Sequence, residues 1–143
     1  FLTSENNIFD FISDHEGIRK DIYLDHKGIP TIGVGYNLKN ADVLTLLVGK
    51  FGYSEEALKR SDYKELESKL SKVVNESEWN KSTLDANTKK INDILKKYKD
   101  KNTDPELKAK AKDTFSFSEF GDTDAAKAAM KLIFETAMQD YER

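Results

Sequence analysis

The chain of 143 residues contains no cysteine, which excludes disulfide bonds and thiolate metal ligands and leaves its compartment open. Two prolines are too few for a proline-rich linker, and no repeat or low-complexity segment is found. No apolar run approaches the roughly 20 residues that a helix needs to cross a bilayer, so we expect no membrane insertion. No signal peptide is visible. Because the chain starts at Phe1 instead of methionine, we expect it to be part of a longer protein.

The chain also lacks an excess of positive charge. It contains 23 lysines and arginines and 26 aspartates and glutamates, so its net charge is −3. The resulting pI is near 5.5. This balance argues against binding to nucleic acid and against adhesion to an anionic membrane. Hydrophobic residues make up 38% of the chain and charged residues 34%, as in ordinary globular domains. The length fits one domain, or two small lobes that share a helix.

What the chain does have is an informative pattern in residues 7–37. Apolar residues recur at helical spacing from Ile8 to Ile12, and Gly17 stands where a left-handed residue would end the helix. Glu16 then lies in the last turn. There the exposed carbonyl groups and the negative end of the helix dipole disfavour an anion, so we expect a raised pKa for Glu16. A carboxyl group with a raised pKa suits general-acid catalysis.

A hairpin is predicted after this helix. Residues 21–24 and 31–36 have the composition of short strands, and the segment between them is rich in turn-forming residues. Asp25 lies at the start of the turn, where we expect a wetter setting that keeps the carboxylate ionised. Thr31 follows six residues later and carries a hydroxyl group able to hold a water molecule. The helix and hairpin together therefore have the layout of a site for acid/base hydrolysis of a glycosidic bond.

The motif E-G-x5-Y-x-D-x2-G-x2-T-I-G-V-G, which begins at Glu16, resembles the start of the phage-type lysozymes. The Glu, Asp and Thr of that family fall at the same spacing without a gap. The resemblance implies a muramidase that cleaves the β-1,4 bond between N-acetylmuramic acid and N-acetylglucosamine in peptidoglycan. It implies an inverting mechanism, in which Glu16 protonates the leaving oxygen while Asp25, with Thr31, directs water from the opposite face.

The resemblance covers residues 7–37, and it makes Gly35, Tyr36 and Asn37 candidate substrate-binding residues. Tyr36 stands where family members commonly have histidine, and Asn37 stands where a leucine lines the sugar groove, so the sugar contacts are expected to differ. Gly33 and Gly35 leave one side of the second strand without side chains. This lack of bulk suits the close approach of an extended substrate.

From Asn40 onward the chain is predicted to be almost entirely helical. Asn40 is placed to cap the first of these helices, and Pro105 to begin a helix after a loop. The expected helices cover 41–48, a long connecting segment from Ser54 to Val74, a segment around 91–98, and the end of the chain from Asp122 or Asp124.

These patterns together predict an α+β, mostly helical fold of the two-lobed lysozyme type. The N-terminal lobe, at about 1–53, would hold the first helix and a small hairpin sheet. Residues from about 54 to 143 would form the connecting helix and a helical lobe, and the glycan strand would lie between the lobes. We expect action on the bacterial cell wall, either outside the cell or in the periplasm of a target cell. Peptidoglycan strands are the expected partner, with an immunity or inhibitor protein as a second.

No metal or organic cofactor is expected, because two carboxylates suffice for glycoside hydrolysis. The run Asp100–Asp104 resembles the opening of a calcium-binding loop. However, Pro105 replaces the required glycine and Ala111 replaces the bidentate glutamate, so we interpret this segment as a turn.

Several alternatives stay open at this level. The domain fits a wall-binding module without activity on the same scaffold, or an interaction domain whose partner docks on the apolar stripe at 130–141. The same stripe also fits a core helix. Trp79, Phe115, Phe117 and Phe120 fit either sugar stacking or the core. A phage endolysin, a bacteriocin and an injected antibacterial effector are all compatible settings, and the acidic pI favours a delivered toxin.

Overall fold

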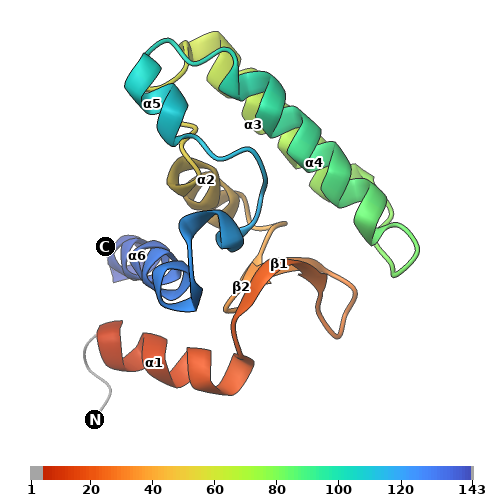
Figure 1. Ribbon diagram of the computed structural model, residues 1–143. Helices are drawn as coiled ribbons and strands as arrows, with labels where there is room; N and C mark the ends of the chain where they lie inside the picture. Colours follow the sequence, from red (N-terminus) through yellow and green to blue (C-terminus); the bar gives the residue numbers. More distant parts are fainter. Residues whose placement is uncertain (1–4, 143) are drawn as a thin grey trace.

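The computed structural model describes the backbone of residues 5–142, with the side chains of residues 8–14 and 17–138. It is mostly helical with one small antiparallel sheet, which confirms the α+β class (Figure 1). Within the described residues, no helix is both long and apolar enough to cross a membrane. In chain order the elements are α1 (Glu5–Glu16), β1 (Arg19–Leu24), β2 (Pro30–Gly33), β3 (Tyr36–Asn37), α2 (Ala41–Lys50), α3 (Arg60–Glu76), α4 (Leu84–Lys99), α5 (Pro105–Lys110), the 3₁₀ helix η1 (Phe117–Phe120) and α6 (Thr123–Glu142).

The three strands form an antiparallel sheet in the order β1-β2-β3. Thr31 lies in the central strand, opposite Tyr23 on one side and Asn37 on the other. The prediction of one continuous strand at 31–36 is wrong. Gly33, the last residue of β2, and Gly35 adopt positive φ angles of 71° and 92°. These angles end the extended conformation, and the chain turns between β2 and β3.

Side chains at the helix ends explain where two of the helices begin. The Asn40 carboxamide accepts hydrogen bonds from the first backbone N–H groups of α2, and the Asp104 carboxylate does the same for α5, which starts at Pro105. Both starts were predicted. The predicted helical start at Ser54 is wrong, because the segment from Ser54 forms a turn through hydrogen bonds to the Ser54 carbonyl, and α3 begins only at Arg60.

The core contains most of the aromatic residues. The Phe51 ring lies 4.8 Å from that of Phe115 and 5.4 Å from that of Phe117, between ring centroids, and all three side chains are buried. The Trp79 indole N–H donates to the Val74 carbonyl at 2.9 Å and is only partly exposed. Of the two alternatives that the sequence left open, Phe115 and Phe117 therefore belong to the core.

Helix α6, the last helix of the described chain, packs against α1 and α2 (Figure 1). Met130 and Ile133 are buried in this contact, whereas Leu132 faces outward. The apolar stripe of α6 is therefore a core face over its described side chains. It fixes the first helix, and with it the start of the hairpin, against the rest of the molecule.

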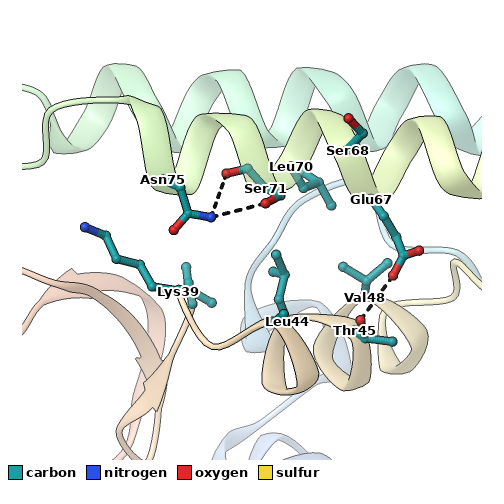
Figure 2. A pocket seen from close by; sticks show the side chains of 11 residues that line it. Lys39, Leu44, Thr45, Val48, Glu67, Ser68, Leu70, Ser71 and Asn75 are labelled. Atoms are coloured by element: carbon teal, nitrogen blue, oxygen red, sulfur yellow. Dashed lines mark hydrogen bonds between the residues drawn. The ribbon is translucent and has the colours of Figure 1, made fainter.

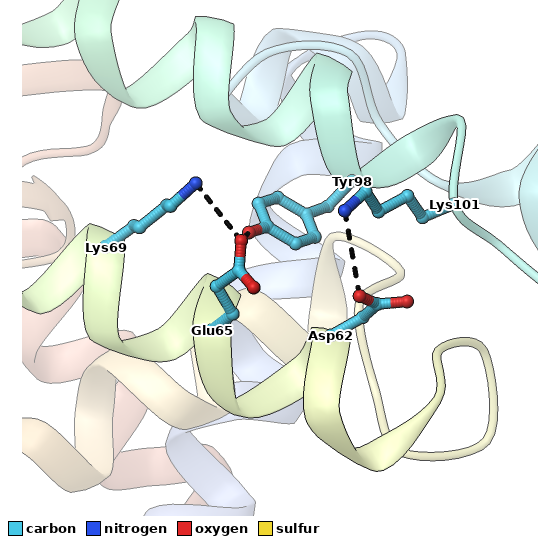
Figure 3. Close-up of polar contacts among 5 residues, drawn as sticks. All are labelled: Asp62, Glu65, Lys69, Tyr98 and Lys101. Atoms are coloured by element: carbon cyan, nitrogen blue, oxygen red, sulfur yellow. Dashed lines mark hydrogen bonds and ion pairs between the residues drawn. The ribbon is translucent and has the colours of Figure 1, made fainter.

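Helices α3 and α4 form an antiparallel pair that extends along one side of the molecule (Figure 1). A polar network ties their ends together (Figure 3). The Tyr98 hydroxyl donates to Glu65, Lys69 pairs with Glu65 at 3.2 Å, and Lys101 pairs with Asp62 at 3.7 Å. The hydrogen bond from Tyr98 lowers the pKa of Glu65, and burial raises the pKa of Tyr98. This network joins two helices that are separated by a turn in sequence.

Candidate active site

The turn between β1 and β2 is closed by the Asp25 side chain. Its Oδ1 atom accepts hydrogen bonds from the backbone N–H groups of Lys27, at 2.8 Å, and Ile29, at 2.9 Å. The Gly28 N–H donates to the Asp25 carbonyl at 2.9 Å, and Gly28 has a positive φ of 79°. An aspartate that bonds to the backbone two residues later is a standard turn former. The carboxylate of Asp25 is thus held at the start of the turn, as predicted.

These hydrogen bonds also keep the Asp25 carboxylate ionised. They stabilise the charged form, with the Ile29 amide as the largest contribution and the Lys27 amide as a smaller one, and they lower the pKa below the ordinary value of 3.8. Slight burial opposes the shift, and the nearby charges of His26 and Lys27 favour it. Because both amides bond to Oδ1, the second carboxylate oxygen remains for a water molecule or ligand.

Ile29 connects Asp25 to Thr31 through its backbone. Its carbonyl accepts the Asp25 N–H at 3.0 Å and the Thr31 hydroxyl at 2.8 Å, while its own N–H donates to the Asp25 carboxylate. Thr31 is only 3% exposed. Since its hydroxyl proton is used by Ile29, the Thr31 oxygen is left as a hydrogen-bond acceptor. The structure thus links two of the predicted site residues through hydrogen bonds to the backbone of Ile29.

The three candidate sugar-binding residues have different environments. Tyr36 is 8% exposed, its hydroxyl donates to the Met130 carbonyl of α6 at 2.6 Å, and burial raises its pKa. Gly35 and Asn37 are exposed, and the Asn37 Oδ1 atom accepts the Lys39 N–H. Tyr36 therefore anchors the hairpin to α6, and the open edge of the sheet consists of Gly35 and Asn37.

Gly33 does not provide space for a substrate, in contrast to the prediction. A Cβ atom at this position would lie 2.8 Å from Cδ2 of Tyr36, so the aromatic ring fills the space that the glycine leaves. At Gly35 the same construction meets no atom within 4 Å. Of these two glycines, Gly35 is therefore the one that has open space where a side chain would lie.

Glu16 is the last residue of α1, as predicted, and Gly17 follows with a positive φ of 78° and an N–H that bonds to the Ser13 carbonyl. The Glu16 side chain lies outside the described part of the structure. A shallow groove of about 410 Å³ begins two residues later in the sequence. It is lined by residues 18–23 and by Thr123, the first residue of α6. The Arg19 guanidinium lies over the Tyr23 ring, 4.9 Å from its centroid. The start of β1 therefore has a concave surface beside the α1 terminus.

A second concave site lies between the β3–α2 turn and α3, and sequence reasoning missed it. This pocket of about 300 Å³ has buried leucine and valine side chains at its base and polar groups around its mouth (Figure 2). Asn75 and Ser71 from α3 lie on one wall, and Lys39 lies near them from the β3–α2 turn. The amphipathic patterns of α2 and α3 predict that each helix buries one face, but they do not predict that the two helices meet.

Local contacts give the hairpin site its geometry, whereas the pocket depends on how distant segments pack. Within the part of the chain that the structure describes, no cluster of histidine, aspartate or glutamate side chains has the arrangement of a metal site. Comparison of the chain with protein-family models, curated proteins and solved structures finds no match.

Proposed function

We propose that this chain is a peptidoglycan hydrolase, a muramidase with a two-lobed lysozyme-like fold that acts on the bacterial cell wall. The observation that carries the proposal is the geometry of the hairpin. Asp25 and Thr31 both hydrogen-bond to the backbone of Ile29, within the sequence motif that resembles the phage-type lysozymes. A glycan strand would pass along the exposed edge at Gly35 and Asn37.

Hydrolysis would use the two oxygen atoms of the Asp25 carboxylate differently. Oδ1 is held by two backbone N–H groups, so the second oxygen is the one able to orient and deprotonate a water molecule. The Thr31 oxygen, which can only accept a further hydrogen bond, would accept one from the other O–H of that water and so orient it. Glu16 would donate its proton to the leaving oxygen, and the sugar would be released with inverted configuration.

Inversion requires the two carboxyl groups to lie roughly 6.5–9.5 Å apart, which leaves room for the water. Asp25 comes nine residues after Glu16, and a straight strand of this length would extend over more than about 25 Å at roughly 3.3 Å per residue. The shift in pairing register between Arg19 and Tyr23 indicates a bulge in β1. Because a bulge bends and twists its strand, it supports a closer approach of the two residues.

One observation favours a second candidate, a peptidoglycan-binding module without activity. The hydrogen bonds from Lys27 and Ile29 give Asp25 a structural reason to be an aspartate, as the residue that closes the turn. This role alone would preserve the hairpin without any catalysis. The two candidates differ in whether intact glycan is cut or only bound.

The test is release of reducing muropeptides from purified peptidoglycan by the parent and by the variants Asp25→Asn and Glu16→Gln. We expect each variant to lose about 10²- to 10⁴-fold in rate, the usual contribution of a general acid or base. Asn retains a carbonyl oxygen for the Lys27 and Ile29 amides, so Asp25→Asn keeps the turn. Asp10→Asn, on the exposed side of α1, is the matched control and should behave like the parent.

Two results would overturn the proposed hydrolysis. One is equal activity of the parent and of both carboxylate variants, which would remove Asp25 and Glu16 from the chemistry. The other is a folded parent that co-sediments with peptidoglycan and releases no muropeptides, which is the behaviour of the binding module. Circular dichroism of each variant establishes that the fold is retained.

A further inference from the structure

The pocket between α2 and α3 has a polar end with both donors and acceptors. The Asn75 side-chain NH₂ group donates to the carbonyl and hydroxyl oxygens of Ser71, at 3.0 and 3.1 Å. This orients Asn75 so that its Oδ1 atom, which has no partner among the described residues, points away from Ser71 and toward the side of Lys39 (Figure 2). The Ser71 hydroxyl, which accepts from Asn75, keeps its own proton to donate. The Lys39 ammonium has no ion pair within the described chain.

Beyond this polar end the base of the pocket is apolar, and a second polar pair lies at the far end. Leu44 and Leu70 face each other across it, and Thr45 and Glu67 bond to one another at 3.1 Å on the side opposite to Lys39 (Figure 2). The buried members of the base are Leu38, Leu44, Val48 and Leu70. A volume of about 300 Å³ lies at the lower end of the range of roughly 300–1,000 Å³ for small-molecule sites. It fits a single ring or substituent better than an extended chain.

We propose that this pocket binds the acetamido group of an N-acetylated hexosamine. An acetamido group presents one N–H donor, one carbonyl acceptor and one methyl group. The Asn75 oxygen would accept the N–H, the Ser71 hydroxyl or Lys39 ammonium would donate to the carbonyl, and the methyl group would contact Leu44 and Leu70. A hexose without this substituent leaves the leucines uncovered and the Asn75 oxygen unpaired.

The position of the pocket connects it to the hairpin site. Leu38, in the pocket base, donates its N–H to the Pro30 carbonyl, and Pro30 in turn pairs with Leu24, which precedes Asp25. The pocket thus lies two strand spacings, about 10 Å, across the sheet from the start of the catalytic turn. Strand β2 lies between them, and the exposed Asn37, which precedes Leu38, pairs with Thr31 of this strand. A glycan strand that crosses this end of the sheet from Asp25 would also reach the pocket, so this inference rests on the proposed function for the identity of its ligand.

The test uses two soluble trisaccharides, N,N′,N″-triacetylchitotriose and cellotriose, which carry acetamido and hydroxyl groups respectively at the same ring position. Methyl-detected NMR titration should show that only triacetylchitotriose shifts the resonances of Leu38, Leu44 and Leu70. Asn75→Ala and Lys39→Met should each weaken its binding about five- to tenfold, as expected for the loss of one or two hydrogen bonds. Lys64→Met, at an exposed lysine of α3 outside the pocket, is the matched control.

Equal shifts by the two trisaccharides would overturn the proposed specificity, as would shifts confined to other residues or unchanged affinity of Asn75→Ala. These outcomes differ from a failure of the proposed function. If Asp25→Asn loses hydrolysis while Asn75→Ala keeps the parent's KM and affinity, the pocket assignment alone fails. If triacetylchitotriose binds in the pocket and the parent releases no muropeptides, hydrolysis alone fails.

Discussion

Two glycines of the hairpin differ in what their missing side chains allow. Both adopt positive φ angles, so each is favoured for its backbone conformation. At Gly33 the absent side chain also makes room for the Tyr36 ring, while at Gly35 the absent side chain faces open space. The Tyr36 ring cannot shift freely, because its hydroxyl is bound to the Met130 carbonyl in the core. Gly33 is therefore a packing residue and Gly35 an exposed turn residue.

Substitution of the two glycines by alanine tests this difference. We expect Gly35→Ala to lower the free energy of unfolding by about 1–2 kcal/mol, the cost of a left-handed backbone for an L-residue. Gly33→Ala should cost about 1–3 kcal/mol more, because its Cβ would overlap the Tyr36 ring at 2.8 Å. Urea unfolding of both variants measures the difference. A larger loss for Gly35→Ala would contradict the assignment.

At the scale of elements, the Tyr36 hydroxyl joins β3 to α6 over 94 residues of sequence. This bond and the one from Ser116 to Asp21, at 2.5 Å, hold the hairpin against the C-terminal part of the chain. Neither bond can be predicted from a local sequence pattern, because its two partners lie far apart in the chain. They determine where the edge with Gly35 and Asn37 lies relative to the helices.

Tyr36→Phe should therefore lower the free energy of unfolding by about 1 kcal/mol, the usual net value of one hydrogen bond. The Met130 carbonyl lies within α6, so it can keep its helical hydrogen bond, and the loss should not be larger. Urea unfolding gives the value, and hydrogen exchange should show faster opening in β3. Tyr63→Phe, at a partly exposed tyrosine of α3, is the control and should lose less. A loss in Tyr36→Phe no greater than that of the control would show that the bond does not secure the hairpin.

The elements that could be predicted from sequence are those with local causes. Asn40 and the pair Asp104 and Pro105 mark helix starts because capping involves residues only a few positions apart. Asp25 was placed correctly at a turn for the same reason. The split between β2 and β3 was missed, because the alternation of apolar residues in 31–36 does not reveal that Tyr36 folds over Gly33. The hydroxyl bond of Thr31 to Ile29 and the pocket between α2 and α3 depend on the folded backbone, which sequence periodicity does not specify.

At the scale of the whole molecule, elements that follow residue 54 pack against elements of the first 53 residues. Helix α6 covers α1 and α2, η1 contacts β1, and α4 also reaches β1 (Figure 1). The Tyr53 hydroxyl adds bonds to the Leu95 carbonyl, at 3.0 Å, and the Lys112 carbonyl, at 2.5 Å. The hairpin site is thus supported by segments from both ends of the chain, and its geometry depends on the complete fold of the described residues.

The net charge of −3 predicts how activity on whole cell walls responds to salt. Bacterial walls carry negatively charged carboxylates and phosphates, so they repel an acidic hydrolase at low ionic strength. Raising the ionic strength from 0.01 to 0.15 M shortens the Debye length from about 30 to about 8 Å and screens this repulsion. We expect muropeptide release from intact walls to rise over this range, while cleavage of uncharged chito-oligosaccharides in solution stays nearly constant. Initial rates on both substrates at each salt concentration test the prediction. A rate on walls that falls with salt would contradict this prediction. It would mean that a local basic surface, such as the one formed by Lys69, Lys97 and Lys101 around Tyr98, influences the approach to the wall more than the net charge does.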